Sequence, residues 1–317
     1  MKKMIVGLFL LLVVGIIGSV VSIKADGGFS FRTFKVADKE VVNGDKIDSI
    51  DIDLSSSNVQ VVPTKEKNIT VELSGKVSKK LKNKYKLDVQ EQGRTLKISI
   101  KGEDVIIFNI GTSIMNMNVD VLLPEKVYRS LKVKTSSGSN GIENLQAENI
   151  ILKSSSGDIE ARGSVSKYQF SFKSSSGEVS SENNQANEFV LQASSGSINA
   201  INQQGKQSTF HTSSGEINVS NGIGDLQADT SSGDIDINND EVTGDLNAST
   251  SSGEVSVSYN ENPNSLAVDF KGSSGEGNIG IKGLNYEEKS EHRIIGQLGS
   301  GEYKIQVRTS SGDFNLN

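Results

Sequence analysis

The most regular feature of the chain is an alternation of apolar and polar positions on both sides of a recurring Ser-Ser-Gly tripeptide. Counted from the Gly, apolar or small residues occupy positions −7, −5, −3, +2 and +4. Around Gly233 these positions hold Leu226, Ala228, Thr230, Ile235 and Ile237. A period of two residues is typical of a β-strand with one buried face. Each tripeptide is therefore predicted to be a turn between two short strands.

The tripeptide recurs about every nineteen residues, so the chain is predicted to be a repeat protein. Its Gly stands at Gly138, Gly157, Gly177, Gly196, Gly215, Gly233, Gly253, Gly275 and Gly312, and Gly301 belongs to a Gly-Ser-Gly variant. We expect the Gly to adopt a positive φ at the corner and the two Ser to hydrogen-bond locally in the turn. Because so short a strand pair cannot bury its apolar face alone, successive copies are expected to stack as coils.

The same register appears once upstream, around Ser57, without a Gly. Its apolar positions are Ile50, Ile52, Leu54, Val59 and Val61. This indicates a degenerate first coil that starts near residue 46. Longer alternating strands are expected at 69–73, 85–89, 96–100 and 117–123, with a hairpin loop at 91–94. This region is either an insertion into the stack or a cap at its start.

The amino terminus carries an uncharged run from Met4 to Ile23, long enough as a helix to cross a bilayer of about 30 Å. A cleaved signal peptide is the alternative, but its apolar stretch is usually about 7–15 residues long. We therefore predict an uncleaved transmembrane signal anchor. A large Ser- and Asn-rich body after a short tail favours an extracytoplasmic location for that body.

Together these patterns predict an all-β protein, a single-stranded β-solenoid or β-helix of about ten coils of roughly 19 residues, preceded by one N-terminal transmembrane helix. The predicted parts are a signal anchor at 1–25, a linker at 26–45, an N-terminal β region at 46–135 and the repeat solenoid at 136–317.

The repeated unit resembles that of the bacterial putative-adhesin β-strand repeat family, whose function is uncharacterised. The resemblance rests on segments such as Thr230-Ser-Ser-Gly-Asp-Ile-Asp-Ile237 and covers roughly residues 46–317. With its amino-terminal run, the chain is similar to the membrane-anchored LiaG-type proteins encoded with Gram-positive envelope-stress systems. The resemblance implies a β-repeat fold and supplies no catalytic or ligand residues.

Charge is unevenly distributed along the chain. Residues 1–137 carry 22 Lys and Arg against 15 Asp and Glu, a net +7, whereas residues 138–317 carry 11 against 24, a net −13. This indicates a basic surface next to an acidic one. The absence of Cys excludes a disulfide scaffold and any thiolate metal site.

A lysine cluster within eleven acid-free residues is the first candidate contact surface: Lys76, Lys79, Lys80, Lys82, Lys84 and Lys86. Such a patch can bind anionic lipid heads or anionic wall polymers. The alternative is an exposed loop with solvated lysines. Nucleic acid is not expected as a partner, because the aromatic residues needed for base stacking are nearly absent there.

An uncharged apolar stretch follows at 105–119. It holds a candidate partner contact of Ile106, Ile107, Phe108, Ile110, Ile114, Met115 and Met117. The alternative is a hairpin that is buried against the rest of the domain.

Candidate catalytic and metal-binding residues are sparse. An acidic residue follows most of the turns, as at Asp158 and Glu178, but Ser139 and Ser197 interrupt the series, so no metal site is assigned. The sequence Ser164-Val-Ser-Lys167 matches a Ser-x-x-Lys pattern without its companion motifs. No phosphate-binding loop or nucleophile elbow is present.

The chain is therefore interpreted as a non-enzymatic, adhesin-like interaction protein of the cell membrane, without cofactor, metal or nucleic acid. Its expected partners are the membrane, cell-wall polymers or co-encoded stress-response proteins. The alternatives are a carbohydrate-active β-helix enzyme that acts on envelope polysaccharide, or a purely structural spacer.

Overall fold

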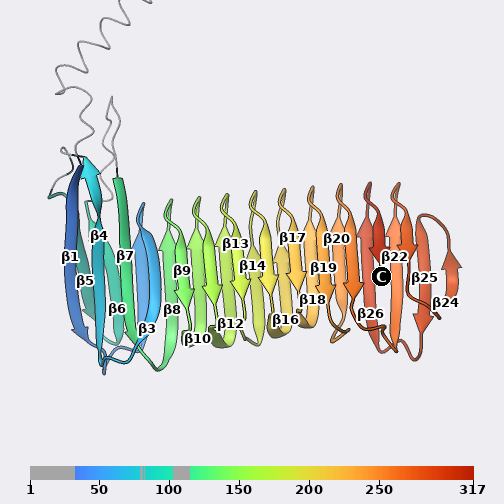
Figure 1. Cartoon of the computed structure of the whole chain (residues 1–317), viewed down its shortest axis with the longest axis horizontal. Coiled ribbons are helices and arrows are strands. Elements are labelled where there is room, and N and C mark those ends of the chain that lie inside the picture. The colour runs from blue at the N-terminus through green and yellow to red at the C-terminus, as the bar shows by residue number, and fades with distance from the viewer. Residues whose placement is uncertain (1–32, 79–80, 82, 103–114) are drawn as a thin grey trace, which may run out of the picture.

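The computed structural model describes residues 33–78, 81, 83–102 and 115–317, which form an elongated all-β body (Figure 1). In these residues the strands make two long mixed sheets, here named sheet A and sheet B, which face each other across one hydrophobic core. Along most of the chain, consecutive strands alternate between the two sheets.

Sheet A contains, in spatial order, β1 (Thr33–Asn43), β4 (Asn68–Ser78), β7 (Met115–Pro124), β3 (Asn58–Thr64), β9 (Asn140–Glu143), β11 (Ile159–Arg162), β13 (Val179–Glu182), β15 (Ile198–Ile201), β17 (Ile217–Ser220), β19 (Ile235–Asn239), β21 (Val255–Tyr259), β27 (Phe314–Leu316) and β23 (Gly277–Ile279). Sheet B contains β24 (Asn285–Lys289), β25 (Arg293–Leu298), β22 (Leu266–Gly272), β26 (Tyr303–Thr309), β20 (Leu246–Thr250), β18 (Ile223–Thr230), β16 (Gln204–His211), β14 (Glu188–Gln192), β12 (Val165–Ser174), β10 (Gln146–Ser154), β8 (Val127–Thr135), β2 (Ser49–Leu54), β6 (Thr95–Lys101) and β5 (Lys86–Gln92).

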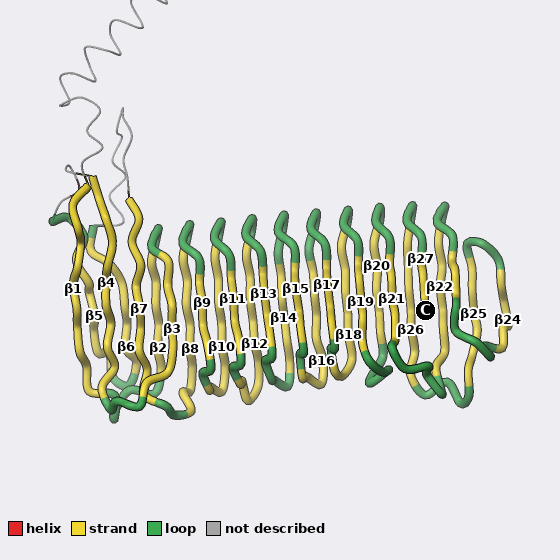
Figure 2. The backbone as a smooth tube through the Cα atoms, viewed as in Figure 1, coloured by secondary structure: helices red, strands yellow, loops and turns green. Residues whose placement is uncertain are grey.

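Each repeat supplies one strand to sheet B, a Ser-Ser-Gly corner, one strand to sheet A and a second corner, so that loops line both long edges (Figure 2). The apolar residues of the alternating pattern point into the core, as the sequence predicts. Leu226, Ala228, Thr230, Ile235 and Ile237 of one repeat are all buried. The equivalent positions around Ser57 are buried as well, so the first coil exists without its Gly.

The core is packed by residues from successive coils. Phe170 on β12 lies in register with Phe189 on β14, and their rings stack with centroids 5.4 Å apart. Phe172 meets Phe170 edge-on, also at 5.4 Å. Burying each such ring stabilises the fold by about 1.5–3 kcal/mol. The coils are therefore held together by side-chain packing as well as by the parallel ladders.

The order of coils in space differs from their order in the chain, which corrects the predicted fold class. The last strands of the chain, β26 and β27, lie between β20/β21 and β22/β23, so the C-terminus sits inside the row of strands (Figure 1). At the other end, β6 and β7 lie outside β2 and β3, although they follow them in the chain. The prediction that the coils stack in chain order was therefore wrong, because strands near both ends of the chain lie out of sequence order in the sheets.

Antiparallel strands close the two ends and make both sheets mixed. At one end β5 and β6 form the predicted hairpin, with Gly93 at φ 64°, while β4 pairs with both β1 and β7. At the other end β22, β25 and β24 run antiparallel. All five residues of β24 are exposed, and they include two Glu and one Lys. Charged edge strands of this kind discourage pairing with another chain.

The predicted membrane helix is the second part of the fold class that needs correction. Among the described residues, none of the elements is a helix with the length and apolarity to cross a bilayer. The run at 4–23 lies outside the described residues. Residues 33–43, part of the segment treated above as a linker, form strand β1.

Candidate functional site

The Ser-Ser-Gly corners stack directly on one another, and their glycines are required for close approach. A Cβ placed on Gly177 would lie 2.1 Å from the carbonyl oxygen of Gly157, and on Gly312 it would lie 1.6 Å from that of Gly253. None of the nine stacked glycines has a positive φ, so the conformational reason expected from the sequence was wrong. Gly301 does have a positive φ, 68°, and lies outside the stack.

In most repeats a buried hydroxyl three residues before the Gly links one coil to the next, but Ala193 and Gly272 occupy this position before Gly196 and Gly275. The Thr212 hydroxyl donates to the Gly196 carbonyl at 3.0 Å and accepts from the Gly215 N–H at 3.2 Å. Thr230 and Thr250 repeat both contacts in the following coils. The structural role in the corner therefore belongs to this Ser or Thr, while the two Ser of the tripeptide have exposed side chains.

The acidic residues after the Gly also form a column, and its repulsion is offset by backbone donors. The Asp158 carboxylate accepts a hydrogen bond from the Glu178 N–H at 2.9 Å, and Asp234 accepts from the Glu254 N–H at 2.8 Å. Ser139 replaces an acid and accepts from the Asp158 N–H at 3.3 Å. Donors of this kind stabilise the charged form of a carboxylate.

The Asp236 carboxylate lies beside this column, and among the described residues no backbone N–H donates to it. Burial raises the pKa of Asp236, and the nearby carboxylates of Asp234 and Glu254 raise it further. In the described part of the chain, no group of three or more His, Asp or Glu residues has the geometry of a metal site.

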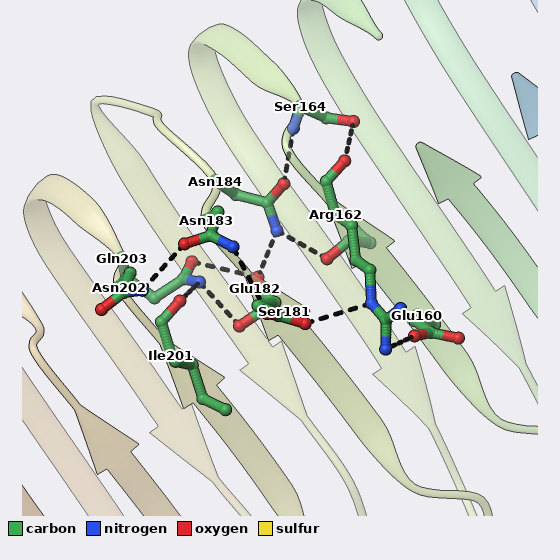
Figure 3. Close-up of polar contacts among 11 residues, drawn as sticks. Glu160, Arg162, Ser164, Ser181, Glu182, Asn183, Asn184, Ile201, Asn202 and Gln203 are labelled. Atoms are coloured by element: carbon green, nitrogen blue, oxygen red, sulfur yellow. Dashed lines mark hydrogen bonds and ion pairs between the residues drawn. The ribbon is translucent and has the colours of Figure 1, made fainter. Parts of the chain in front are cut away.

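The second corner, on the opposite edge, is built on asparagines (Figure 3). Asn183, Asn202 and Asn221 adopt φ values of 54°, 53° and 53°. Asn tolerates this left-handed conformation better than most residues. Their amides form a ladder, in which Asn202 donates to Asn183 at 2.8 Å and Asn221 donates to Asn202 at 3.2 Å. The sequence analysis missed this corner.

Buried polar side chains fill the space behind the asparagine ladder (Figure 3). The Asn184 amide donates to the Ala161 carbonyl and accepts from the Ser164 N–H, both at 2.8 Å. The Ser181 hydroxyl donates to the Gln203 side chain at 3.0 Å. Because these groups satisfy one another in a buried setting, they specify the geometry of the corner.

The Ser-x-x-Lys sequence lies at this corner and is structural. The Ser164 hydroxyl is buried, donates to the Arg162 carbonyl at 3.0 Å and accepts from the Leu145 N–H at 3.1 Å. The Ser166 hydroxyl bonds to the carbonyls of Glu148 and Gln169. Neither hydroxyl is held in the manner of an activated nucleophile, which needs an adjacent base.

The two histidines lie apart from each other. His211 is exposed on the outer face of sheet B. His292 has its Nδ1 atom 2.8 Å from the Gly275 carbonyl, near the C-terminal end of the stack.

The predicted lysine cluster lies at the N-terminal end of the body. Lys76, on β4, is exposed and lies opposite Lys35 on β1. Lys84 and Lys86 are exposed before and at the start of β5. Lys79, Lys80 and Lys82 lie outside the described residues.

The apolar candidate contact divides in the same way. Met117 is buried in the core at 1 % exposure, so it is a core residue rather than a contact surface. Met115 is the first residue of β7. Ile106, Ile107, Phe108, Ile110 and Ile114 lie outside the described residues.

The fold and its surfaces define a solenoid-like β-repeat protein that displays ladders of polar side chains. The chain belongs to the Toastrack DUF4097 family, whose model matches residues 47–317.

Solved structures that are similar to this chain include a "putative adhesin" from Parabacteroides distasonis, 13% identical, with a TM-score of 0.47 over 90% of this chain and 97% of that one. Another is a "putative adhesin" from Bacteroides fragilis, 13% identical, with a TM-score of 0.43 over 91% and 99%. A "putative lipid binding protein" from Parabacteroides distasonis is 18% identical, with a TM-score of 0.43 over 89% and 96%. No curated protein matches the chain.

Proposed function

We propose that this protein is a non-enzymatic, adhesin-like binding protein of the cell envelope that engages an extended polymer through its rows of exposed side chains. The observation that carries this proposal is the separation of roles within each repeat. Ser164, Ser166 and Thr212 are buried and hydrogen-bonded within the fold, while the exposed positions recur in register from coil to coil. A surface that repeats at the strand spacing of about 4.8 Å suits a ligand that also repeats.

The proposed location of the body is extracytoplasmic, where such polymers occur. The uneven charge of the chain supports an anionic partner for its basic N-terminal part, which includes Lys76 and Lys86. A place among the LiaG-type proteins of envelope-stress systems belongs to the same proposal. Protease treatment of intact cells tests the location: an extracytoplasmic body is cleaved without lysis, and a body that is protected until lysis contradicts it.

Co-sedimentation of the purified full-length chain with isolated envelope material tests the binding. The expected result is saturable binding without release of soluble glycan fragments. A folded protein that stays in the supernatant with every envelope preparation would refute the proposal. Release of glycan fragments during the incubation would replace it with an enzymatic function.

A further inference from the structure

Three lysines form a row on the outer face of sheet B, each one residue before the end of its strand and separated from a Ser-Ser-Gly corner by one buried Ser or Thr. Lys134 on β8 pairs in register with Lys153 on β10, and Lys153 pairs in register with Lys173 on β12. All three are exposed. Neighbouring strands lie about 4.8 Å apart, so three ammonium groups start from backbone positions at that spacing. We call Lys134, Lys153 and Lys173 the lysine row.

The protein neutralises this row only at one end. Lys134 lies 3.4 Å from Asp53 on β2, and in the described residues Lys153 and Lys173 have no ion-pair partner. The next residues in the row are Gln192 on β14 and then His211 on β16. Like charges directly opposite each other on neighbouring strands are destabilising. Unlike the carboxylate column at the same corner, which receives backbone N–H donors, the lysine row has no internal compensation at Lys153 and Lys173.

Exposed hydroxyls follow the lysine in each of these three coils. Ser155 and Ser156 follow Lys153 at one residue's remove, and Ser175 and Ser176 follow Lys173 in the same way. Their backbone groups take part in the ladder between corners, as in the bond from the Ser176 N–H to the Ser155 carbonyl at 3.1 Å. Each of these three coils therefore presents one cation and two hydroxyls in the same order.

We propose that the lysine row and the adjacent serines bind a linear acidic polysaccharide that lies across β8, β10 and β12, along the long axis of the body. This inference deepens the proposed function by naming its binding site and ligand class. Successive carboxylates of the polymer accept from Lys134, Lys153 and Lys173, which relieves the repulsion between them. Its hydroxyl groups meet the exposed serines. A polymer that carries carboxylates and hydroxyls can bind both the lysine row and the adjacent serines, whereas a polyphosphate can pair only with the lysines.

The test uses the full-length chain and alginate, a linear polyuronate, as the probe. K153Q/K173Q is expected to bind alginate about three- to tenfold more weakly than wild type, because each exposed ion pair contributes modestly. K206Q/K282Q is the control, since it removes the same charge from two other exposed lysines and is expected to change binding less than about twofold. K153R/K173R is expected to bind like wild type. Circular dichroism melting establishes that each variant is folded.

Undiminished alginate binding by K153Q/K173Q would overturn the proposal. The serines are tested with S155A/S156A/S175A/S176A, which is expected to weaken alginate binding and leave the binding of inorganic polyphosphate unchanged. Equal affinity of the wild type for both polymers, with no effect of the serine variant, would also overturn the ligand class. If K153Q/K173Q sediments with envelope material as wild type does, the lysine row fails as the site while the proposed function stands. If wild type sediments with none, the proposed function itself fails.

Discussion

A Gly-to-Ala substitution in the middle of the corner stack tests why these glycines are present. At Gly177 an added Cβ would lie 2.1 Å from the Gly157 carbonyl oxygen and 2.8 Å from the Asp158 nitrogen. Both atoms belong to backbone, so no side chain can turn away. Two coils that share an in-register ladder would have to separate locally by about 1 Å to reach ordinary contact distances.

The cost follows from what that separation disturbs. The hydrogen bond from the Ser174 hydroxyl to the Gly157 carbonyl, 3.2 Å long, and the bond from the Ser176 N–H to the Ser155 carbonyl, 3.1 Å long, would stretch. Each contributes about 1 kcal/mol, and overpacking adds about 1–3 kcal/mol. We therefore expect G177A to lower the free energy of unfolding by about 2–5 kcal/mol, a large share of the stability of an ordinary domain.

Urea unfolding followed by circular dichroism measures this loss. S175A, an exposed change in the same corner, is the matched control and is expected to stay within about 0.5 kcal/mol of wild type. G177N separates the two explanations for Gly. If a positive φ were the reason, Asn would be tolerated better than Ala; if close approach is the reason, Asn is at least as harmful. Wild-type stability of G177A, or a milder effect of G177N, would refute the reasoning.

Other contacts give further expectations. T212V should lower the free energy of unfolding by about 2–3 kcal/mol in urea titrations, because it leaves the buried Gly215 N–H and Gly196 carbonyl without their hydroxyl, whereas T212S should lose less; equal losses would contradict this. D236N should raise the melting temperature slightly at neutral pH, because the raised pKa of Asp236 means that its ionised form is disfavoured in the folded state; this gain should vanish as the pH falls below the pKa of the unfolded carboxyl. At Asp269, burial raises the pKa, but hydrogen bonds from Arg308 and Arg293 outweigh burial, so the pKa is lowered. The ionised Asp269 carboxylate therefore stabilises the fold, and this stabilisation should be lost as the pH falls through the folded-state pKa. A D269N variant with an unchanged acid-unfolding profile would argue against that. Deletion of 303–317 should abolish a single cooperative melt, since it empties a place inside both sheets.

The alternating pattern was sufficient to predict the buried faces, because in a half-buried strand a two-residue period places all the apolar residues on one face. Ile50, Ile52 and Leu54 were identified as a coil without a Gly on that basis, and all three are buried. The reason for the Gly was not predictable in this way. Close approach between coils depends on how they stack, whereas a turn signal in one repeat points to local backbone conformation.

The asparagine corner did leave a signal in the sequence. Asn144, Asn183, Asn202 and Asn221 each stand six residues after the Gly of their own repeat. That regularity, with Gly163 at the same offset, is what a second left-handed corner requires. A polar residue at one offset in each repeat is also found in ordinary exposed loops, so the apolar alternation alone does not distinguish a second corner from such a loop.

The order of the coils is a different kind of problem, because strand β26 carries the same alternation as any other repeat. Ile305 pairs with Leu246 on one side and with Val268 on the other, and each of these apolar partners would suit many neighbours. The position of β26 in sheet B is distinguished by Asp269, which forms ion pairs with Arg308 of β26 and Arg293 of β25. Such interactions are long-range and specific, so they select among registers that the repeated pattern leaves equivalent. The same reasoning applies to binding, because the repeats share their pattern of buried positions and are distinguished by their exposed residues. The lysine row, present in three coils and replaced by Gln192 and His211 in the next two, is therefore where a ligand can distinguish one part of the stack from another.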